Sequence, residues 1–265
     1  MTWINTVKKR LADGESVIGA TITTPGVEIA ARIADLGFDF LWIEMEHSPI
    51  TLESLRTIVL ATRGMAAIPF ARVPINELWT AKRVLDAGVA GVIFPFTNTP
   101  QDAKQAAASC RYPPHGERGS GAGNAMFTWP GDPEYYDCAD SNILVVTVVE
   151  DVRALDSIDE ITSTEGVDVV FIGVSDLSFS LGLRGQQDVP ELHSAIDKIV
   201  AACKRNNKVV GRPAGSPEAL RRFQEQGFRF FQGPTEIGLL NQGGRGFLEP
   251  LGKSRQPGQR VKSLY

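Results

Sequence analysis

Short apolar runs alternate with longer amphipathic stretches along most of the chain. The run at 144–149 is Leu-Val-Val-Thr-Val-Val, and the run at 91–94 is Gly-Val-Ile-Phe. Runs with so few polar residues indicate strands covered on both faces, which is typical of a parallel sheet. The predicted strands are 17–22, 38–43, 67–71, 91–94, 143–149, 167–172, 208–210 and 228–231.

The amphipathic stretches between these runs predict helices. Thr24-Pro25, Thr99-Pro100 and Ser216-Pro217 each place a capping residue before a proline, a pattern favoured at helix starts. Eight strand–helix units in one domain of this length predict a (β/α)8 TIM barrel over residues 1–250. A doubly wound open sheet is the structural alternative.

Two stretches lie outside this alternation. Residues 111–142 are rich in Gly, Pro and Tyr and form an unusually long connection, so we expect a functional or interfacial role. The tail at 251–265 is basic, contains Gly and Pro and has no periodicity. We therefore expect an extended or disordered arm there.

The amino-acid composition indicates a globular protein and limits the partners to be expected. The chain has 43% hydrophobic and 22% charged residues and a net charge of −4, which is ordinary for a globular protein. Both signs of charge are interspersed, so neither nucleic acid nor a membrane is expected as a partner. The three cysteines have no metal-ligand spacing and are odd in number, which favours a reducing, cytoplasmic location. No segment predicts a signal peptide or a membrane span.

Candidate chemistry gathers at the predicted strand ends. The second strand is followed by Glu44 and His47, and the third by Arg72. The fifth strand is followed by Glu150, and the sixth by Asp176. Because active sites of such barrels lie at the carboxyl ends of the strands, we expect these side chains to share one rim.

The two carboxylates at 150 and 176 point to a metal site. Glu150 ends an apolar strand, where a carboxylate is costly unless it is paired or binds a metal. Capping of the next helix is the alternative role, but Asp151 can serve there. Asp176 could likewise cap a short helix, although it lies one strand from Glu150. Because adjacent carboxylates repel without a cation, their oxygens predict Mg²⁺ or Mn²⁺.

His47 could supply an acid–base group and Arg72 a cationic group to the same site. The alternative is that His47 is an ordinary surface residue and that Arg72 forms an exposed salt bridge. Glu44 could orient the His47 imidazole for acid–base chemistry, and Arg72 could hold a developing oxyanion. A Schiff-base aldolase needs a lysine at a strand end, whereas Lys208 lies at a strand start and the others on helices or in the termini. The glycine-rich segment 119–123 follows no strand and is a weak phosphate-loop candidate.

Five motifs occur in an order that is specific as a set. They are Phe-Asp-Phe-Leu-Trp-Ile-Glu-Met-Glu-His at 38–47, Ala-Arg at 71–72, Arg-Tyr-Pro-Pro-His-Gly-Glu-Arg-Gly at 111–119, Val-Glu at 149–150 and Gly-Val-Asp-Val-Val-Phe-Ile-Gly-Val-Ser-Asp-Leu-Ser at 166–178. With them, residues 18–240 resemble the HpcH/HpaI aldolase family, the class II pyruvate aldolases of the phosphoenolpyruvate/pyruvate barrel superfamily.

The resemblance implies roles for the matching residues. Glu150 and Asp176 match the family's two metal ligands, and His47 matches its acid–base histidine. Arg72 matches the arginine that holds the keto oxygen. Asp86 matches an aspartate that reaches a neighbouring subunit's site. The backbone around Ser175 would hold the pyruvate carboxylate, and the implied substrate-binding residues are Arg72, Gly173, Ser175 and Asp176.

The implied activity is that of a carbon–carbon lyase. It would reversibly cleave a 4-hydroxy-2-keto acid to pyruvate and an aldehyde, through a pyruvate enolate stabilised by Mg²⁺, Mn²⁺ or Co²⁺. Oxaloacetate decarboxylation, or enolate trapping as in macrophomate synthase, is the alternative, and a barrel that binds or assembles without catalysis is a third possibility. Glu44 stands where many relatives have an aspartate beside the histidine. The family also implies a trimeric or hexameric homo-oligomer that exchanges a C-terminal helix.

Overall fold

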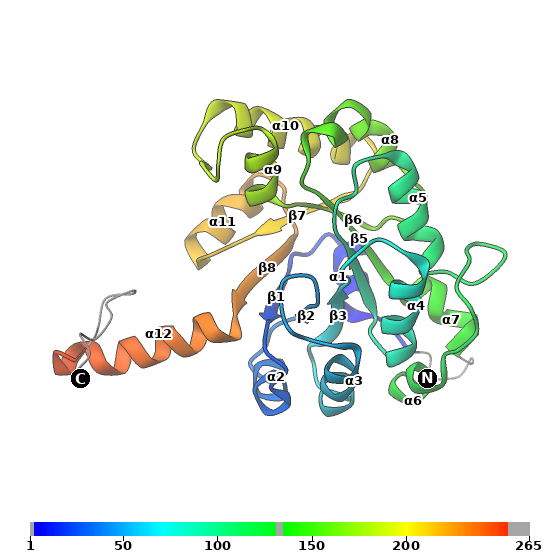
Figure 1. The fold of residues 1–265 in the computed structure, drawn as a ribbon, viewed down its shortest axis with the longest axis horizontal. Coiled ribbons are helices and arrows are strands. Elements are labelled where there is room, and N and C mark those ends of the chain that lie inside the picture. Colours follow the sequence, from blue (N-terminus) through cyan, green and yellow to red (C-terminus); the bar gives the residue numbers. More distant parts are fainter. Residues whose placement is uncertain (1–2, 131–134, 254–265) are drawn as a thin grey trace, which may run out of the picture.

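Eight parallel strands form a closed barrel (Figure 1). The computed structural model describes residues 3–130 and 135–253. Each strand pairs with the next along the chain, and β1 pairs with both β2 and β8. This closure confirms the (β/α)8 barrel and excludes the open sheet. The strands are β1 (Val17–Ile22), β2 (Phe40–Glu44), β3 (Ile68–Arg72), β4 (Gly91–Phe94), β5 (Leu144–Val149), β6 (Val169–Ile172), β7 (Val209–Pro213) and β8 (Phe230–Thr235).

Helices surround the barrel and return the chain to the start of the next strand (Figure 1). The α-helices are α1 (Thr6–Ala12), α2 (Val27–Ala34), α3 (Leu52–Ala61), α4 (Leu78–Ala87), α5 (Pro100–Ser109), α6 (Gly123–Thr128), α7 (Tyr135–Asn142), α8 (Ile158–Ser163), α9 (Val174–Ser180), α10 (Pro190–Arg205), α11 (Pro217–Glu225) and α12 (Glu236–Leu248). Two 3₁₀ helices, η1 (Val152–Ser157) and η2 (Glu249–Leu251), precede α8 and follow α12.

Aromatic rings fill the interior of the barrel. The ring of Phe40 stacks on those of Phe70 and Phe230, with centroids 5.0 and 4.7 Å apart. Glycines make room for these rings, because a Cβ at Gly19 would lie 2.2 Å from Phe40 and a Cβ at Gly91 would lie 2.7 Å from Phe70. The interior is therefore a packed core, and polar chemistry is left to the mouth of the barrel.

Two of the three predicted helix starts are confirmed. Thr99 caps α5 in a reciprocal capping box, and the side chain of Ser216 caps α11. The Thr24-Pro25 start is wrong, because α2 begins only at Val27. The Thr24 amide instead donates to the Glu236 carboxylate (2.6 Å), which ties the end of β1 to the start of α12.

The stretch 111–142 is packed against the barrel by a buried arginine. The Arg118 guanidinium donates to Asp86 Oδ1 on α4 (3.0 Å) and to the Tyr135 hydroxyl (3.2 Å). It also lies over the ring of Tyr112, 4.7 Å from the centroid. Arg118 is only 1% exposed. This stretch, which includes α6 and α7, is thus anchored to α4.

The last helix, α12, leaves the barrel and points away from it (Figure 1). Leu239 near its start packs against the core, but Leu240 and Phe247 face solvent and are 67% and 75% exposed. Of the arm predicted at 251–265, residues 254–265 lie outside the described residues. In the described part of the chain, no helix is both long and apolar enough to cross a bilayer.

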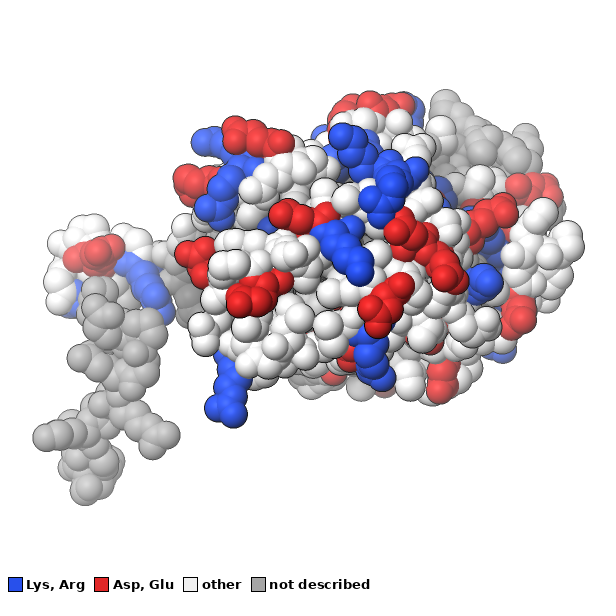
Figure 2. All heavy atoms as spheres, turned by 90° about the horizontal axis from the view of Figure 1, so that it is seen from above, with Lys and Arg blue, Asp and Glu red and all other residues white. Residues whose placement is uncertain are grey.

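Basic and acidic side chains are interspersed over the face seen in Figure 2. No single sign of charge dominates that face, as the sequence predicts.

Candidate active site

Glu44, the last residue of β2, fixes the turn that carries His47. Its Oε1 accepts hydrogen bonds from the backbone amides of Glu46 (2.9 Å) and His47 (3.1 Å). Its Oε2 accepts from Trp42 Nε1 (3.1 Å). The sequence predicts that Glu44 orients the imidazole, and this stays a prediction: Glu44 contacts the backbone amide of His47, whereas the ring lies beside Glu46 and Arg72.

Arg72, the last residue of β3, lies beside Glu44 in the register of the sheet. Its Nη1 is 3.5 Å from Glu44 Oε2. Its Nη2 forms an ion pair with Glu46 and lies 3.7 Å from Glu150 Oε2 and 3.5 Å from His47 Nε2. One guanidinium therefore connects the ends of β2, β3 and β5.

Glu150 directly follows β5 and is almost fully buried, at 2% exposed. Burial raises the pKa of this carboxyl to about 7, against the opposing effects of Arg72 and of the Phe96 amide, which donates to Oε1 at 2.7 Å. Gly173 allows this placement, because a Cβ there would lie 2.6 Å from Glu150 Oε2. Asp151, as predicted, caps the following helix η1, so Glu150 has no structural task there.

Asp176 and Ser175 lie in the first turn of α9, which begins after Gly173. Both residues are exposed. The charge of Asp176 contributes to the raised pKa of Glu150, which reflects its place on the same rim. The amides of this first turn have no partner within the helix. Glu150 and His47 both lie beside Arg72 Nη2, and Asp176 acts on the charge of Glu150 from the start of α9.

Asp86 is separate from this cluster. It lies in the last turn of α4, which runs back along the barrel from the end of β3, and it pairs with Arg118. A ten-residue helix spans about 15 Å, so Asp86 lies well away from the mouth of its own barrel. Its predicted contact with a neighbouring subunit's site stays a prediction.

Glu46 is the residue to which sequence reasoning assigned no role. Its side chain is 11% exposed and pairs with Arg72. Burial raises the pKa of Glu46, while Arg72 and His47 oppose that shift. Glu46 lies two positions after Glu44 and directly before His47. That spacing was visible in the sequence, but its ion pair depends on the register between β2 and β3.

The residues present fit a hard divalent cation. Glu44, Glu46, Glu150 and Asp176 place four carboxyl groups at the mouth beside the one guanidinium of Arg72. The charges of Glu46 and Asp176 both help to raise the pKa of Glu150, and a cation on these oxygens would relieve that repulsion. Among residues 3–130 and 135–253, no three His, Cys, Asp or Glu side chains are gathered as a complete ligand set. A metal here would complete its shell with water or substrate oxygens, as Mg²⁺ does on one or two carboxylates.

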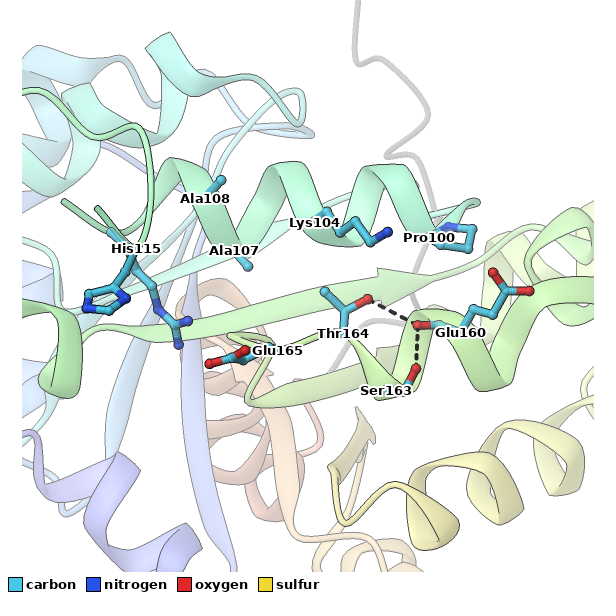
Figure 3. Close-up of a pocket in the computed structure, with 10 residues that line it drawn as sticks. Pro100, Lys104, Ala107, Ala108, His115, Glu160, Ser163, Thr164 and Glu165 are labelled. Carbon is cyan, nitrogen blue, oxygen red and sulfur yellow. Dashed lines mark hydrogen bonds between the residues drawn. The ribbon is translucent and has the colours of Figure 1, made fainter. Parts of the chain in front are cut away.

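A separate polar groove of about 480 Å³ lies on the outside of the barrel between α5 and α8 (Figure 3). Lys104 on α5 and Glu160 on α8 lie on opposite walls, and His115 lies at one end. This places His115, whose role the sequence left open, away from the strand ends.

Known proteins are similar to this chain in both sequence and fold. The family model HpcH/HpaI aldolase/citrate lyase matches residues 25–241. A hydroxypyruvate/pyruvate aldolase of Roseobacter denitrificans is 32% identical over 243 residues, covering 91% of this chain and 95% of that protein. A 5-keto-4-deoxy-D-glucarate aldolase of Salmonella arizonae is 33% identical over 228 residues, covering 86% and 87%.

The structure of an HpcH/HpaI aldolase/citrate lyase family protein from Burkholderia cenocepacia matches with a TM-score of 0.86 and 31% identity, covering 94% of this chain and all of that one. These matches confirm the family predicted from the strand-end motifs. The chain belongs to the HpcH/HpaI aldolase/citrate lyase family, and it is a carbon–carbon lyase of the aldolase type.

Proposed function

We propose that this chain reversibly cleaves a 4-hydroxy-2-keto acid into pyruvate and an aldehyde, with a divalent metal ion held by Glu150 and Asp176. The observation that carries the proposal is the buried Glu150 carboxylate, 3.7 Å from Arg72, on the rim where His47 is exposed. 5-Keto-4-deoxy-D-glucarate, named for one relative, is a 4-hydroxy-2-keto acid when numbered from its keto end and is the first substrate to assay for cleavage. Hydroxypyruvate, named for another relative, has no C4 and would be assayed only in the condensation direction, in place of pyruvate.

The chain's own groups would bind the pyruvate half of the substrate. The first-turn amides of α9, around Ser175, would donate to its carboxylate together with the backbone at Gly173. Arg72 would donate to the keto oxygen, where negative charge develops as the aldol bond breaks. A bound Mg²⁺, Mn²⁺ or Co²⁺ would act as a Lewis acid that polarises the same carbonyl.

His47 would move the proton at the aldehyde half of the substrate. Its side chain is 61% exposed, so the 4-hydroxyl can approach it from solvent. His47 would take the hydroxyl proton as the C3–C4 bond breaks and its electron pair passes into the enolate of pyruvate. The aldehyde leaves, and protonation at C3 yields pyruvate. Glu44 would hold the turn of His47, and Asp86 would act in the site of a neighbouring subunit.

Proton exchange into pyruvate tests the first half of this reaction. Pyruvate in heavy water is incubated with the protein and Mg²⁺, or with Mn²⁺ that is chelated before the spectrum is recorded. We expect loss of the methyl proton signal that depends on the metal and stops with a chelator. An absence of exchange with either metal contradicts the proposal.

Oxaloacetate decarboxylation uses the same pyruvate half, and no observation favours it over aldol cleavage. Turnover of oxaloacetate is compared with turnover of 5-keto-4-deoxy-D-glucarate under the same metal concentration. We expect faster aldol cleavage; faster loss of carbon dioxide from oxaloacetate would reassign the electrophile but keep the enolate chemistry.

The oligomeric state belongs to the same proposal. The exposed Leu240 and Phe247 on α12, with an apolar groove between α2 and α12 lined by Ile29 and Ile33, support a homo-oligomer that exchanges α12. Light scattering should give a trimer or hexamer, and F247S should shift it toward smaller species. Cytoplasmic localisation stays a prediction from the cysteine content.

A further inference from the structure

Three carboxylates surround the guanidinium of Arg72, but they contact different nitrogens. Glu44 lies 3.5 Å from Nη1. Glu46 and Glu150 both face Nη2, with Glu46 in direct contact and Glu150 at 3.7 Å. Glu46 and Glu150 therefore compete for one nitrogen, and in this structure Glu46 holds it.

The outcome of that competition matters because Glu150 is 2% exposed. A buried carboxylate without water pairs strongly with any cation in reach, since a low local dielectric strengthens charge attraction. Without the negative charge of Glu46, the nearest carboxylate to Nη2 would be Glu150. An Arg72–Glu150 pair would then compete with a metal ion for the same oxygen.

We propose that Glu46 is a positioning residue that keeps Arg72 paired away from Glu150, so that the Glu150 carboxylate stays available to a divalent cation. The inference rests on the proposed function in one respect, namely that Glu150 is a metal ligand. Glu46 acts here through Arg72 and needs no contact with substrate. Its position between Arg72 Nη2 and His47 Nε2, 3.7 Å from the latter, also keeps the guanidinium beside the imidazole.

The test is a double-mutant cycle read by Mn²⁺ binding, with free Mn²⁺ counted by electron paramagnetic resonance in the absence of substrate. The four proteins are wild type, E46Q, R72M and R72M/E46Q, and thermal unfolding shows that each is folded. E46Q should weaken Mn²⁺ binding about tenfold in the wild-type background. In the R72M background, the same substitution should change it by less than about threefold, because no arginine remains to capture Glu150.

Two further variants serve as controls for the cycle. E46D retains the negative charge and should recover part of the lost affinity even if E46Q folds poorly. E53Q removes an exposed carboxylate in the first turn of α3 and should leave Mn²⁺ binding unchanged.

Equal weakening by E46Q in both backgrounds would mean that Glu46 acts directly on the cation, and would overturn the inference. Undiminished binding by E46Q in the wild-type background would overturn it as well. Failure of the proposed function is distinguishable, because it shows in the unsubstituted protein as absent Mn²⁺ binding or absent pyruvate exchange. Absent Mn²⁺ binding removes both proposals, whereas absent exchange alone leaves the role of Glu46 intact.

Discussion

Arg118 is fully buried and Arg72 is largely shielded from solvent, and the surroundings of these two arginines differ in charge balance. Arg118, under the 111–142 stretch, faces one carboxylate, Asp86, and two tyrosines. Arg72, at the mouth, faces three carboxylates within 3.7 Å. The first group is electrically balanced, and the second carries excess negative charge.

The difference in charge balance indicates that the Arg118 cluster stabilises the fold, whereas the Arg72 cluster is suited to binding a metal and substrate. A balanced buried pair needs nothing more than its partners, and removal of one partner leaves a stranded charge. An unbalanced cluster is costly as it stands and gains from a cation supplied from outside. Substitutions at Arg118 should therefore affect stability, whereas substitutions around Arg72 should affect metal binding and catalysis.

The largest expected effect comes from E150Q at the unbalanced cluster. Gln keeps an oxygen for the Phe96 amide but removes the negative charge that would hold the metal. We expect metal-dependent deuteration of pyruvate to fall about a thousandfold, which corresponds to about 4 kcal/mol of transition-state stabilisation. The thermal midpoint of the metal-free protein should not fall, because a desolvated carboxyl has been removed. Deuteration near the wild-type rate would rule out Glu150 as a ligand.

R118M probes the balanced cluster and should act on folding. It leaves Asp86 and the Tyr135 hydroxyl without their donor, so the free energy of unfolding should fall by about 3 kcal/mol, toward the low end for a broken buried pair. Mn²⁺ affinity should change by less than about twofold. The matched control is R153M, which removes an exposed partner of Asp151 and should leave the free energy of unfolding nearly unchanged. A large loss of Mn²⁺ affinity in R118M would break the contrast between the two clusters.

The pH dependence of stability sharpens the contrast further. The pKa of Glu150 is about 7 in the folded metal-free protein, above its ordinary value near 4.5. The folded state therefore binds the proton more tightly, so stability present at low pH is lost as pH rises from about 4.5 to about 7. The loss is on the order of 3 kcal/mol. Urea unfolding of wild type and E150Q at several pH values isolates it, and an equal slope in both proteins would contradict the assignment.

The barrel and the place of Glu150 at a strand end could be predicted from the sequence, because buried segments appear in it as apolar runs. The strand at 91–94 has the predicted bounds, because its apolar run marks it clearly. Glu150 could be singled out because it ends an apolar strand while Asp151 supplies the cap. These are local signals, read within a few residues of one another.

Two kinds of feature could not be predicted from local sequence: the polar ends of strands, and the side-chain contacts between neighbouring strands. β8 was predicted to end at residue 231 but runs to Thr235, because Gln232 and Thr235 pair with β1, on either side of a register shift, without an apolar pattern. The helix α1 was missed, since its seven residues carry only two buried apolar side chains. The pairing of Glu46 with Arg72 depends on the register between β2 and β3, which no local pattern specifies.

The smallest predicted effect concerns Phe96, whose backbone conformation could not be predicted from the sequence. Its φ is 48°, in the left-handed region, and its amide donates to Glu150. F96G keeps this amide and relieves the backbone strain, but it also frees the unfolded chain, so the free energy of unfolding should change by less than about 1 kcal/mol. Mn²⁺ affinity should be retained in F96G. F96A keeps the strain and should be the less stable of the two variants. If F96G instead lost Mn²⁺ binding while F96A kept it, the conformation of this residue, and not its amide alone, would be holding Glu150 in place.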